Sequence, residues 1–554
     1  MAKVFGIDLG TTYSCIASID RYGRPIVYNN ADNQATTPSV VQFTSDNEPI
    51  VGIQAKRSAR VRTDEVAALV KRHMDDPDWR FRANGTDYSA PAVSSQVLQS
   101  LVRDVELATG EVVTDVVITV PAYTGQEFRQ ATKFAGELAG LNVVDIINEP
   151  TAAAFSYGFL QEGSKAQTVM VYDLGGGTFD VTVIRLAEKK IEVVATDGNP
   201  HLGGADWDET IATFLGGRFV REHPEAGDPW DDDAGAQHLL TLAEEVKQSL
   251  SSRKSYVAVV SYRGNLTEVT ITRDELEELT AGLLQRTMDL TRNVLDRAAA
   301  KGVTVIDQVL LVGGMSKSPV VARRIAELFE LEAKLADPDL AVAKGAAIFG
   351  QKRELEIYVL ESLRRTGALT EHEDLSDAEP EALDQAVRQA ASDHAMSTAE
   401  VGDLVATQIT NVTSRGFGIQ AHDAGAGEED LYVEFLAHAQ DQLPISVEQR
   451  FYTRFDNQTS VHVMVMEQNT PVESRRPADS ITVIDGLIED IPVGHPQGTP
   501  VDVKLEMGTD QVITVTARHQ AVADPLVLTI KVGTASAAVR AAEQAKVDEL
   551  KQRS

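Results

Sequence analysis

Short apolar runs bounded by glycine alternate with amphipathic stretches over residues 3–200. Apolar runs of this length are typical of buried strands, whereas apolar positions three and four apart indicate helices. The pattern predicts strands at Val4–Leu9, Val113–Val120, Thr168–Tyr172 and Val181–Ile184. It predicts helices at Ser94–Glu106 and Gly125–Leu138. Strands interleaved with helices indicate an α/β fold.

The following segment, residues 207–301, has a mostly helical pattern, interrupted by two strands at Tyr256–Tyr262 and Glu268–Ile271. A strand at Gln308–Val312 and a helix expected to end near residue 350 come next. We therefore predict that residues 1–350 form the first domain.

The character of the chain changes after this point. Residues 351–410 are rich in Ala, Glu and Asp, which predicts an acidic, solvated spacer with one or two short helices, one of them starting near Pro380. Residues 411–535 switch to short strands separated by turn residues, which predicts an antiparallel sandwich or barrel. The expected strands are Tyr432–His438, Ser460–Met466, Ser480–Ile484, Pro500–Glu506, Val512–Arg518 and Leu526–Val532. Residues 536–554 predict one short, exposed helix.

Charge and cysteine content exclude several classes of protein. The 554 residues include 51 Lys and Arg against 83 Asp and Glu, a net charge of −32. Such a field disfavours binding to nucleic acid or to anionic membranes, both of which require basic side chains. The single cysteine, Cys15, excludes a disulfide framework and a cysteine-based zinc site. Because a charge appears as early as Asp8 and no apolar run reaches about 18 residues, we expect a cytoplasmic protein without a signal peptide or membrane span.

The most informative feature is an internal repeat. Val4–Thr12 and Met170–Thr178 each contain an apolar strand that ends in Asp-Leu-Gly, followed by a turn with Gly and Thr and then a second strand. Glycine allows backbone N–H groups to approach a phosphate, and threonine adds a hydroxyl donor. Asp8 and Asp173, which close the first strands, suit a hydrated Mg²⁺. Two such hairpins predict two related lobes that face each other across a cleft.

The motifs of other nucleotide-binding folds are absent from the sequence. There is no Gly-x-x-x-x-Gly-Lys-Ser/Thr motif, and no Gly-x-Gly-x-x-Gly opens a βα unit. Seven segments in order instead resemble the 70-kDa heat-shock chaperone family: Gly6–Ser14, Val120–Tyr123, Arg129–Thr132, Asn148–Ala154, Asp173–Val181, His201–Gly204 and Leu311–Gly314. The resemblance implies an α/β actin-like ATPase fold with two ribonuclease-H-like lobes, followed by an antiparallel β-sandwich and a short C-terminal helix.

The resemblance also implies a Mg²⁺-dependent ATPase that binds ATP and ADP, with K⁺ as a candidate second cation. Asp8 and Asp173 are the implied metal residues. The implied catalytic residues are Lys71, Glu149, Asp173, Thr178 and Asp180. A surface lysine and an ordinary strand carboxylate are the plainer alternatives for Lys71 and Asp180.

The implied nucleotide contacts fall into two groups. The phosphate-binding group is Gly10, Thr11, Thr12, Tyr13, Gly175, Gly176, Gly177, Gly203 and Gly204. The adenosine-binding group is Glu244, Lys247, Ser251, Gly313, Gly314, Lys317 and Asp339. Glu244, Lys247 and Ser251 share one helix face, which is also what a solvated charged face looks like. Because Gln248 and Lys317 replace arginines of the family, and guanidinium stacks better on a base than ammonium, we expect lower nucleotide affinity.

Two further groups of residues follow from the resemblance. Pro121 and Arg129 match the family's proline switch and the arginine that senses it, although a proline can also simply end a strand. Residues 411–419 and 443–458 are similar to its substrate domain, in which Arg454 replaces a small arch residue. The implied peptide-binding residues are Val433, Phe451, Val461 and Val463, which any sandwich core would also require.

The chain also departs from the family. About 50 residues replace a short leucine-rich linker, and only residues 536–554 stand where a helical lid is usual, so we expect a divergent, lidless member with fast peptide exchange. The leading hypothesis is an ATP-dependent chaperone that binds unfolded or extended polypeptide segments, with a J-domain co-chaperone and a nucleotide-exchange factor as candidate partners. The alternative is a nucleotide-dependent regulatory or scaffold protein whose β-domain binds one dedicated partner. A sugar or metabolite kinase would leave that domain without a role.

Overall fold

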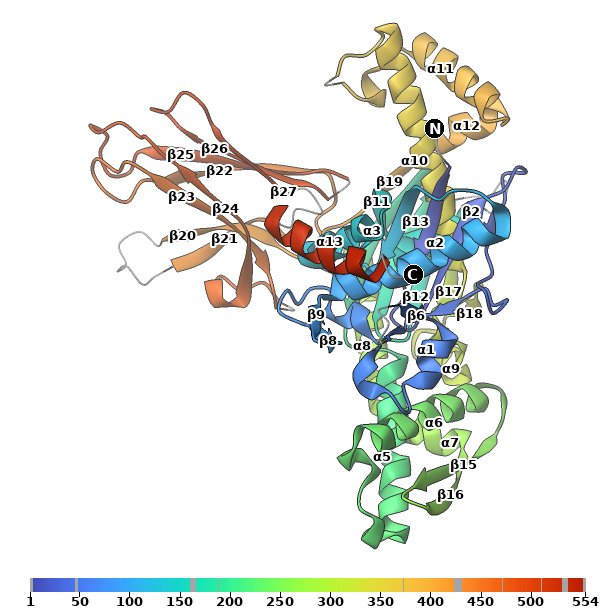
Figure 1. The fold of residues 1–554 in the computed structure, drawn as a ribbon. Coiled ribbons are helices and arrows are strands. Elements are labelled where there is room, and N and C mark those ends of the chain that lie inside the picture. Colours follow the sequence, from blue (N-terminus) through green and yellow to red (C-terminus); the bar gives the residue numbers. More distant parts are fainter. Residues whose placement is uncertain are drawn as a thin grey trace.

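The structure is a computed structural model that describes residues 3–44, 48–159, 166–187, 189–371, 373–422, 431–470, 472–509, 511–530 and 537–551. Figure 1 shows central sheets, a helical region at each end of them, and a separate β-domain on one side. Within the described residues, no helix is long and apolar enough to cross a membrane.

The first lobe is built on a sheet with the strand order β11-β10-β1-β2-β3, in which β4 also pairs with β2. Its strands are β1 (Val4–Asp8), β2 (Tyr13–Ile19), β3 (Pro25–Val27), β4 (Thr37–Pro38), β10 (Asp115–Val120) and β11 (Asn142–Asn148). Strands β1 and β2 form an antiparallel hairpin, and β1 continues in parallel to β10 and β11. One apolar face of this sheet is covered by α2 (Ala90–Thr109) and α3 (Gln126–Leu138).

The second lobe repeats this arrangement, with the strand order β18-β17-β12-β13-β14-β19. Its strands are β12 (Gln167–Leu174), β13 (Phe179–Ala187), β14 (Lys190–Asn199), β17 (Gln308–Val312), β18 (Ala333–Leu335) and β19 (Gln408–Thr410). Strands β12 and β13 form the antiparallel hairpin, and β12 is parallel to β17. The sequence repeat is therefore also a structural repeat.

The two lobes are joined through α4 (Glu149–Phe159) and α10 (Ala341–Thr366). These helices cross so closely that a Cβ added at Gly345 would lie 1.7 Å from the carbonyl oxygen of Ala152. The sequence predicted a helix end near residue 350, and this prediction is wrong because α10 continues to Thr366.

A helical region with its own apolar core extends from the second lobe. It contains α5 (Gly204–Glu222), η3 (Pro224–Ala226), η4 (Pro229–Asp231), α6 (Asp233–Ser252), β15 (Ser255–Tyr262), β16 (Asn265–Thr272) and α7 (Arg273–Leu279). Three further elements pack against the sheet of the second lobe instead: α8 (Ala281–Ala300), η5 (Gly314–Lys317) and α9 (Pro319–Phe329). Smaller elements of the first lobe are β5 (Val41–Phe43), β6 (Pro49–Val51), α1 (Ile53–Ser58), η1 (Thr63–Glu65), β7 (Val66–Ala67), η2 (Val70–His73), β8 (Phe81–Ala83) and β9 (Thr86–Tyr88).

The acidic segment after α10 is packed rather than solvated. It forms η6 (Leu375–Asp377), α11 (Pro380–Asp393), α12 (Thr398–Ala406) and strand β19. Val387 and Ala390 of α11 and Val401 and Leu404 of α12 are buried in the same apolar cluster as α10. Strand β19 then adds in parallel to the edge of β14. The expected solvated spacer is therefore corrected: its few apolar residues are spaced so that two short helices cover the end of α10.

The C-terminal β-domain, residues 417–530, contains two four-stranded sheets with the orders β21-β20-β23-β24 and β22-β25-β26-β27. The strands are β20 (Phe417–His422), β21 (Leu431–Ala437), β22 (Ile445–Tyr452), β23 (Val461–Gln468), β24 (Ser480–Ile488), β25 (Pro500–Met507), β26 (Ile513–His519) and β27 (Leu526–Ile530), with η7 (Pro477–Asp479) before β24. All pairings are antiparallel, and buried side chains of both sheets form one cluster.

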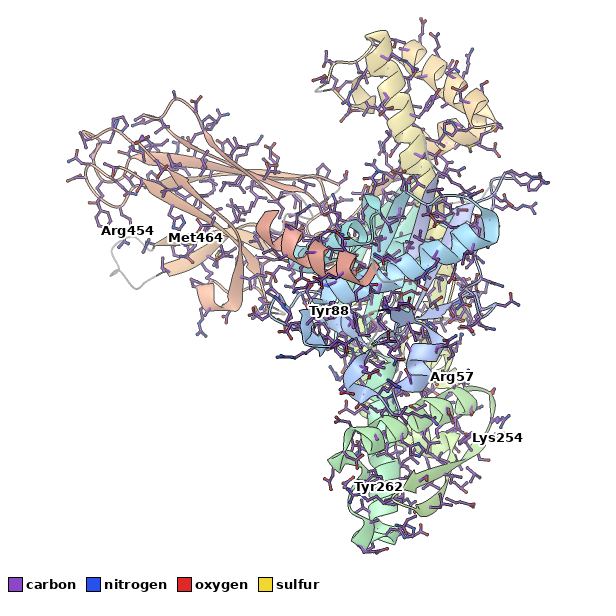
Figure 2. The ribbon with its side chains drawn as sticks, viewed as in Figure 1. Arg57, Tyr88, Lys254, Tyr262, Arg454 and Met464 are labelled. Carbon is purple, nitrogen blue, oxygen red and sulfur yellow. The ribbon has the colours of Figure 1, made fainter. Side chains whose placement is uncertain are left out.

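The last helix, α13 (Ala537–Lys551), lies across the first lobe beside α2 (Figure 1). Val547 and Leu550 are 0% and 2% exposed and belong to the core of that lobe. Arg540 pairs with Glu137 of α3 at 2.8 Å, and β9, with the labelled Tyr88, also contacts α13 (Figure 2). The exposed helix expected from the sequence is therefore a docked one.

Candidate functional site

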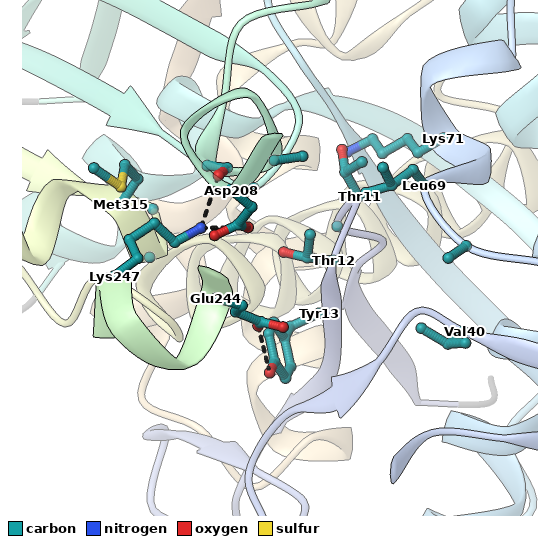
Figure 3. Close-up of a pocket in the computed structure, with 18 of the residues that line it drawn as sticks. Thr11, Thr12, Tyr13, Val40, Leu69, Lys71, Asp208, Glu244, Lys247 and Met315 are labelled. Carbon is teal, nitrogen blue, oxygen red and sulfur yellow. Dashed lines mark hydrogen bonds and ion pairs between the residues drawn. The ribbon is translucent and has the colours of Figure 1, made fainter. Parts of the chain in front are cut away.

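A cavity of about 790 Å³ opens between the lobes, and Figure 3 shows part of its lining. The strand-to-turn junctions of both hairpins, helix α6 and the turn after β17 contribute to it. The predicted residues that line it are Asp8, Gly10, Thr11, Thr12, Tyr13, Lys71, Glu149, Asp173, Gly175, Gly176, Thr178, Gly204, Glu244, Lys247, Ser251, Gly313, Gly314, Lys317 and Asp339. The fold therefore gathers these scattered residues around one space.

The two hairpin turns face each other in close contact. A Cβ at Gly176 would lie 2.1 Å from the hydroxyl oxygen of Thr12, and one at Gly177 would lie 2.3 Å from Cγ2 of Thr11. Neither glycine can be replaced without displacing the opposite turn. Gly203 is similarly confined, because a Cβ added to it would lie 2.5 Å from the backbone nitrogen of Gly177. Because these turns carry no side chains at the glycines, their backbone N–H groups would be able to approach an anion in the cavity.

Helix α5 begins at this point, with Gly203 as its N-cap, and the side chain of Asp206 accepts a hydrogen bond from the backbone nitrogen of Gly203 at 2.7 Å. The backbone nitrogen of Gly204 donates to the carbonyl oxygen of Gly175 at 2.9 Å, which ties the helix start to the second hairpin. A helix N-terminus carries partial positive charge, so it favours an anion at the cavity.

One part of the cavity is lined by three carboxylates and one lysine, and a fourth carboxylate, that of Asp180, interacts electrostatically with this group. Lys71 donates to Glu149 at 2.5 Å, and both side chains are less than one-tenth exposed. Asp8 is the last residue of β1 and Asp173 is the second-last residue of β12, and both line the cavity. Asp180, which is also buried, accepts from the backbone nitrogens of Ala122 and Tyr123, both at 3.2 Å.

This crowding of negative charge changes the acidity of the carboxyls. Burial, followed by the neighbouring Glu149, raises the pKa of Asp8 to about 7 and that of Asp180 to about 7. The same two causes, with Asp180 and Asp8 adding to them, raise the pKa of Asp173 well above its usual range. The arrangement is therefore unfavourable for negative charge unless positive charge is added.

We expect the nucleotide-free protein to lose stability as the pH rises. Because the folded pKa of Asp180 lies near 7, above its value of 3.8 in an unfolded chain, its protonated form favours folding and this contribution disappears through pH 7. Between pH 6 and pH 8, the loss amounts to about 1 kcal/mol for this group. Asp180→Asn should remove that share, as measured by calorimetric unfolding at both pH values. An unchanged pH dependence in the variant would contradict the assignment.

The residues fit a hydrated divalent cation. Among the described residues, no group of three or more His, Cys, Asp or Glu side chains could enclose a metal by itself. Mg²⁺ does not need such a cage, since it usually binds through one or two carboxylates, waters and substrate phosphates. Asp8 and Asp173 line the cavity, and the burial and neighbouring carboxylates that raise their pKa values make added positive charge favourable beside them.

The predicted adenosine residues on α6 face the cavity rather than open solvent. Lys247 donates to the carbonyl oxygen of Gly204 at 2.7 Å and to Asp208 at 2.6 Å (Figure 3). Glu244 pairs with Lys56 of the first lobe at 2.7 Å. The side chains of Lys247 and Glu244 are only 15% and 20% exposed, which argues against a helix face that is simply solvated. On the opposite wall, Lys317 pairs with Asp339.

Sequence reasoning missed three charged residues of this region. Lys56 joins the lobes through Glu244, Asp208 pairs with Lys247, and Arg72 contacts Asp206 at 2.6 Å and the carbonyl oxygen of Gly177 at 3.1 Å. An acid in the first turn is a common sign of a helix start and could have drawn attention to Asp206, but nothing in the local sequence indicates its contact with Arg72. Lys56 has no comparable local signal, because its partner is 188 positions away.

The predicted switch residues, Pro121 and Arg129, lie next to residues that contact or adjoin the buried carboxylates. Pro121 precedes the two amides that bind Asp180, and Arg129 of α3 is 3% exposed and donates to Asn148, next to Glu149. The predicted peptide-binding residues differ in how far they are buried. Val433 and Val463 are 0% and 2% exposed, whereas Phe451 and Val461 are partly buried against the core. Arg454 lies at the far tip of the β-domain (Figure 2), 3.0 Å from the ring of His422.

The sequence also matches the model of a known protein family. A family model described as Hsp70 protein matches residues 4–81 and 67–354. The matched region spans both hairpins and every predicted residue that lines the cavity.

Proposed function

The chain belongs to the Hsp70 family, and on this basis we propose that it is an ATP-dependent chaperone in which hydrolysis at the interlobe cavity controls polypeptide binding by the C-terminal β-domain. Family members are nucleotide-dependent chaperones and ATPases. What is specific to this chain is how its residues would perform both tasks.

The cavity supports phosphoryl transfer to water. That reaction requires little covalent chemistry from the protein but strong stabilisation of charge on the phosphates. We assign Thr11, Thr12 and Thr178, with the turn amides, to phosphate binding, and Lys71 to charge neutralisation at the terminal phosphate. Mg²⁺ held near Asp8 and Asp173 would supply Lewis-acid stabilisation, and K⁺ is a candidate second ion. Glu149 and Asp180 would orient the attacking water.

One observation carries the link to the β-domain. The segment Pro121–Gln126 binds Asp180 through the amides of Ala122 and Tyr123, and its Thr124 carbonyl oxygen accepts from the Ser414 hydroxyl at 3.0 Å. Ser414 follows strand β19, which is paired to the second lobe. We infer that a change of charge at Asp180 reaches Ser414, just before the β-domain, through the segment that contains Ala122, Tyr123 and Thr124.

The proposal predicts that peptide affinity depends on the bound nucleotide. We expect an extended apolar peptide to bind at least about 5-fold more tightly in one nucleotide state than in the other, the lower end of typical coupling energies. Fluorescence anisotropy of a labelled peptide, with ATP or ADP, measures this directly. Ser414→Ala should reduce the ratio, whereas Ser252→Ala on α6 serves as a control. Equal affinities in the two states would contradict the coupling.

We place the peptide against Val433, Phe451, Val461 and Val463. Because Val433 and Val463 are closed to solvent in this arrangement, binding requires the adjoining strands to open. With α13 docked on the first lobe, no helix of the described chain covers the β-domain as a lid, so peptide exchange should be fast. A J-domain co-chaperone and a nucleotide-exchange factor are the partners that such a cycle would use.

The closed state of Val433 and Val463 also favours a second candidate, a nucleotide-dependent scaffold whose β-domain binds one dedicated partner. Suppression of aggregation by several unrelated unfolded proteins would support the chaperone. A single stoichiometric partner with negligible ATP turnover would support the scaffold.

A further inference from the structure

The C-terminal β-domain contacts the first lobe through a buried carboxylate. Glu467 of β23 is 0% exposed, and its two carboxylate oxygens lie 3.4 and 3.3 Å from the backbone nitrogen of Gln126, the first residue of α3. A Cβ at Gly125 would lie 2.6 Å from a carboxylate oxygen of Glu467, so the approach depends on glycine. The acid thus caps a helix that carries the switch residue Arg129.

The remaining contacts fix this arrangement but neutralise the acid poorly. The side-chain amide of Gln126 donates to the carbonyl oxygen of Gln511 at 3.0 Å, which adds a second bond between the domains. The nearest guanidinium, that of Arg415, has its Nε at 3.9 Å from Glu467. Arg415 lies just before the first strand of the β-domain, so it is on the same side of the interface as Glu467 and is not contributed by the first lobe.

The charged groups around Glu467 are both attractive and repulsive. Arg415 and Arg129 favour its ionised form, whereas Glu127 of α3 opposes it. Glu127 and Glu467 line a cavity of about 420 Å³ together with Asp75, which adds a third acid. Burial is the largest effect, and it raises the pKa of Glu467 from 4.5 to about 7. Once the domains separate, the strand end is open to water and this desolvation disappears.

We propose that docking of the C-terminal β-domain on the first lobe is coupled to proton uptake at Glu467, so that acidification favours the docked arrangement. The sign follows from linkage: the docked state binds the proton more tightly, so docking strengthens as the pH falls through 7 and levels off near 4.5. Its effect on ATP turnover rests on the proposed function, whereas the docking equilibrium itself does not.

Energy transfer between two labels tests the coupling in the full chain. Val112→Cys places one label on the first lobe and Val493→Cys places the other on the β-domain, at side chains that are 74% and 72% exposed. Cys15 is 1% exposed and should remain unlabelled. The ratio of docked to undocked protein should increase about 30-fold from pH 8 to pH 5.5, as the change in proton affinity requires. Repeating the series in a Ser414→Ala background, which lacks one bond across the interface, keeps both states measurable.

Three variants separate Glu467 from other titrating groups. Glu467→Gln should stay docked with a ratio that no longer depends on pH. Arg415→Gln should move the midpoint to higher pH, because the acid loses its nearest cation; this variant decides the matter if Glu467→Gln does not fold. His438→Gln removes a nearby residue whose pKa is raised by Glu473, and it should keep the wild-type response.

The outcomes are distinguishable from those of the proposed function. The coupling would be overturned if the ratio of docked to undocked protein did not change with pH in either background, or if it changed in Glu467→Gln as in the wild type. This conclusion does not depend on ATPase activity. A normal pH response without ATP turnover or peptide binding would leave the coupling intact and refute the chaperone.

Discussion

Replacing Lys71 with alanine is expected to reduce ATP turnover by about 100- to 1000-fold, the usual cost of removing one group that stabilises transition-state charge. The side chain is 5% exposed and is the cation that contacts Glu149 at the cavity floor. Charge on the transferred phosphoryl group would otherwise meet the carboxylates of Asp8 and Asp173 directly. Single-turnover hydrolysis with saturating ATP and Mg²⁺ measures the chemical step without product release.

The control for this variant is Lys254→Ala, which removes an exposed lysine beyond the end of α6 (Figure 2). It should hydrolyse ATP at the wild-type rate. Asp8→Asn should reproduce the loss seen with Lys71→Ala, and both variants should retain the wild-type circular dichroism spectrum. Normal hydrolysis in Lys71→Ala and Asp8→Asn would refute the site assignment.

The second large effect concerns stability. Gly345→Ala is expected to lower the free energy of unfolding by about 3 kcal/mol, the upper end of the usual cost of overpacking. The new methyl group would lie 1.7 Å from the carbonyl oxygen of Ala152, which is backbone and cannot rotate away. Helices α4 and α10 would have to separate, and they join the two lobes. Urea unfolding of the nucleotide-free protein measures the loss.

A matched glycine gives the opposite sign. Gly217 also lies inside a helix, α5, but a Cβ there meets no atom within 4 Å. Gly217→Ala should therefore stabilise the protein by about 0.5–1 kcal/mol through helix propensity alone. If the two variants change stability by similar amounts, the close crossing of α4 and α10 is not what holds the lobes together.

Local patterns predicted most of the elements around the interlobe cavity. Strand β17 has the predicted bounds, and β12 and β13 extend the predicted strands by a few residues at each end. Buried strands of a sheet covered by helices are nearly continuous apolar runs, which are easy to recognise. The repeated Asp-Leu-Gly turn also indicated the two facing hairpins, because a phosphate-binding turn depends on consecutive residues.

Contacts between distant segments could not be predicted in this way. The acidic composition of residues 351–410 suggested solvent, yet Val401 and Leu404 are enough to fix α12 on the core. Likewise, α13 has few large apolar residues, but Val547 and Leu550 reach the first lobe. When a helix has only a few large apolar residues, its sequence does not show whether it packs or stays exposed. The outcome depends on whether another part of the fold offers an apolar surface to it.

The sequence by itself determined the family and the two hairpins, since their motifs consist of residues close together in the chain, and the resemblance pointed to many of the residues that line the cavity. The tertiary structure decided which charges meet: Lys56 with Glu244, Lys71 with Glu149, and Glu467 with the start of α3. The physical reason is that burial and the charge of distant neighbours, not residue type, set how much an ionisable group costs or contributes.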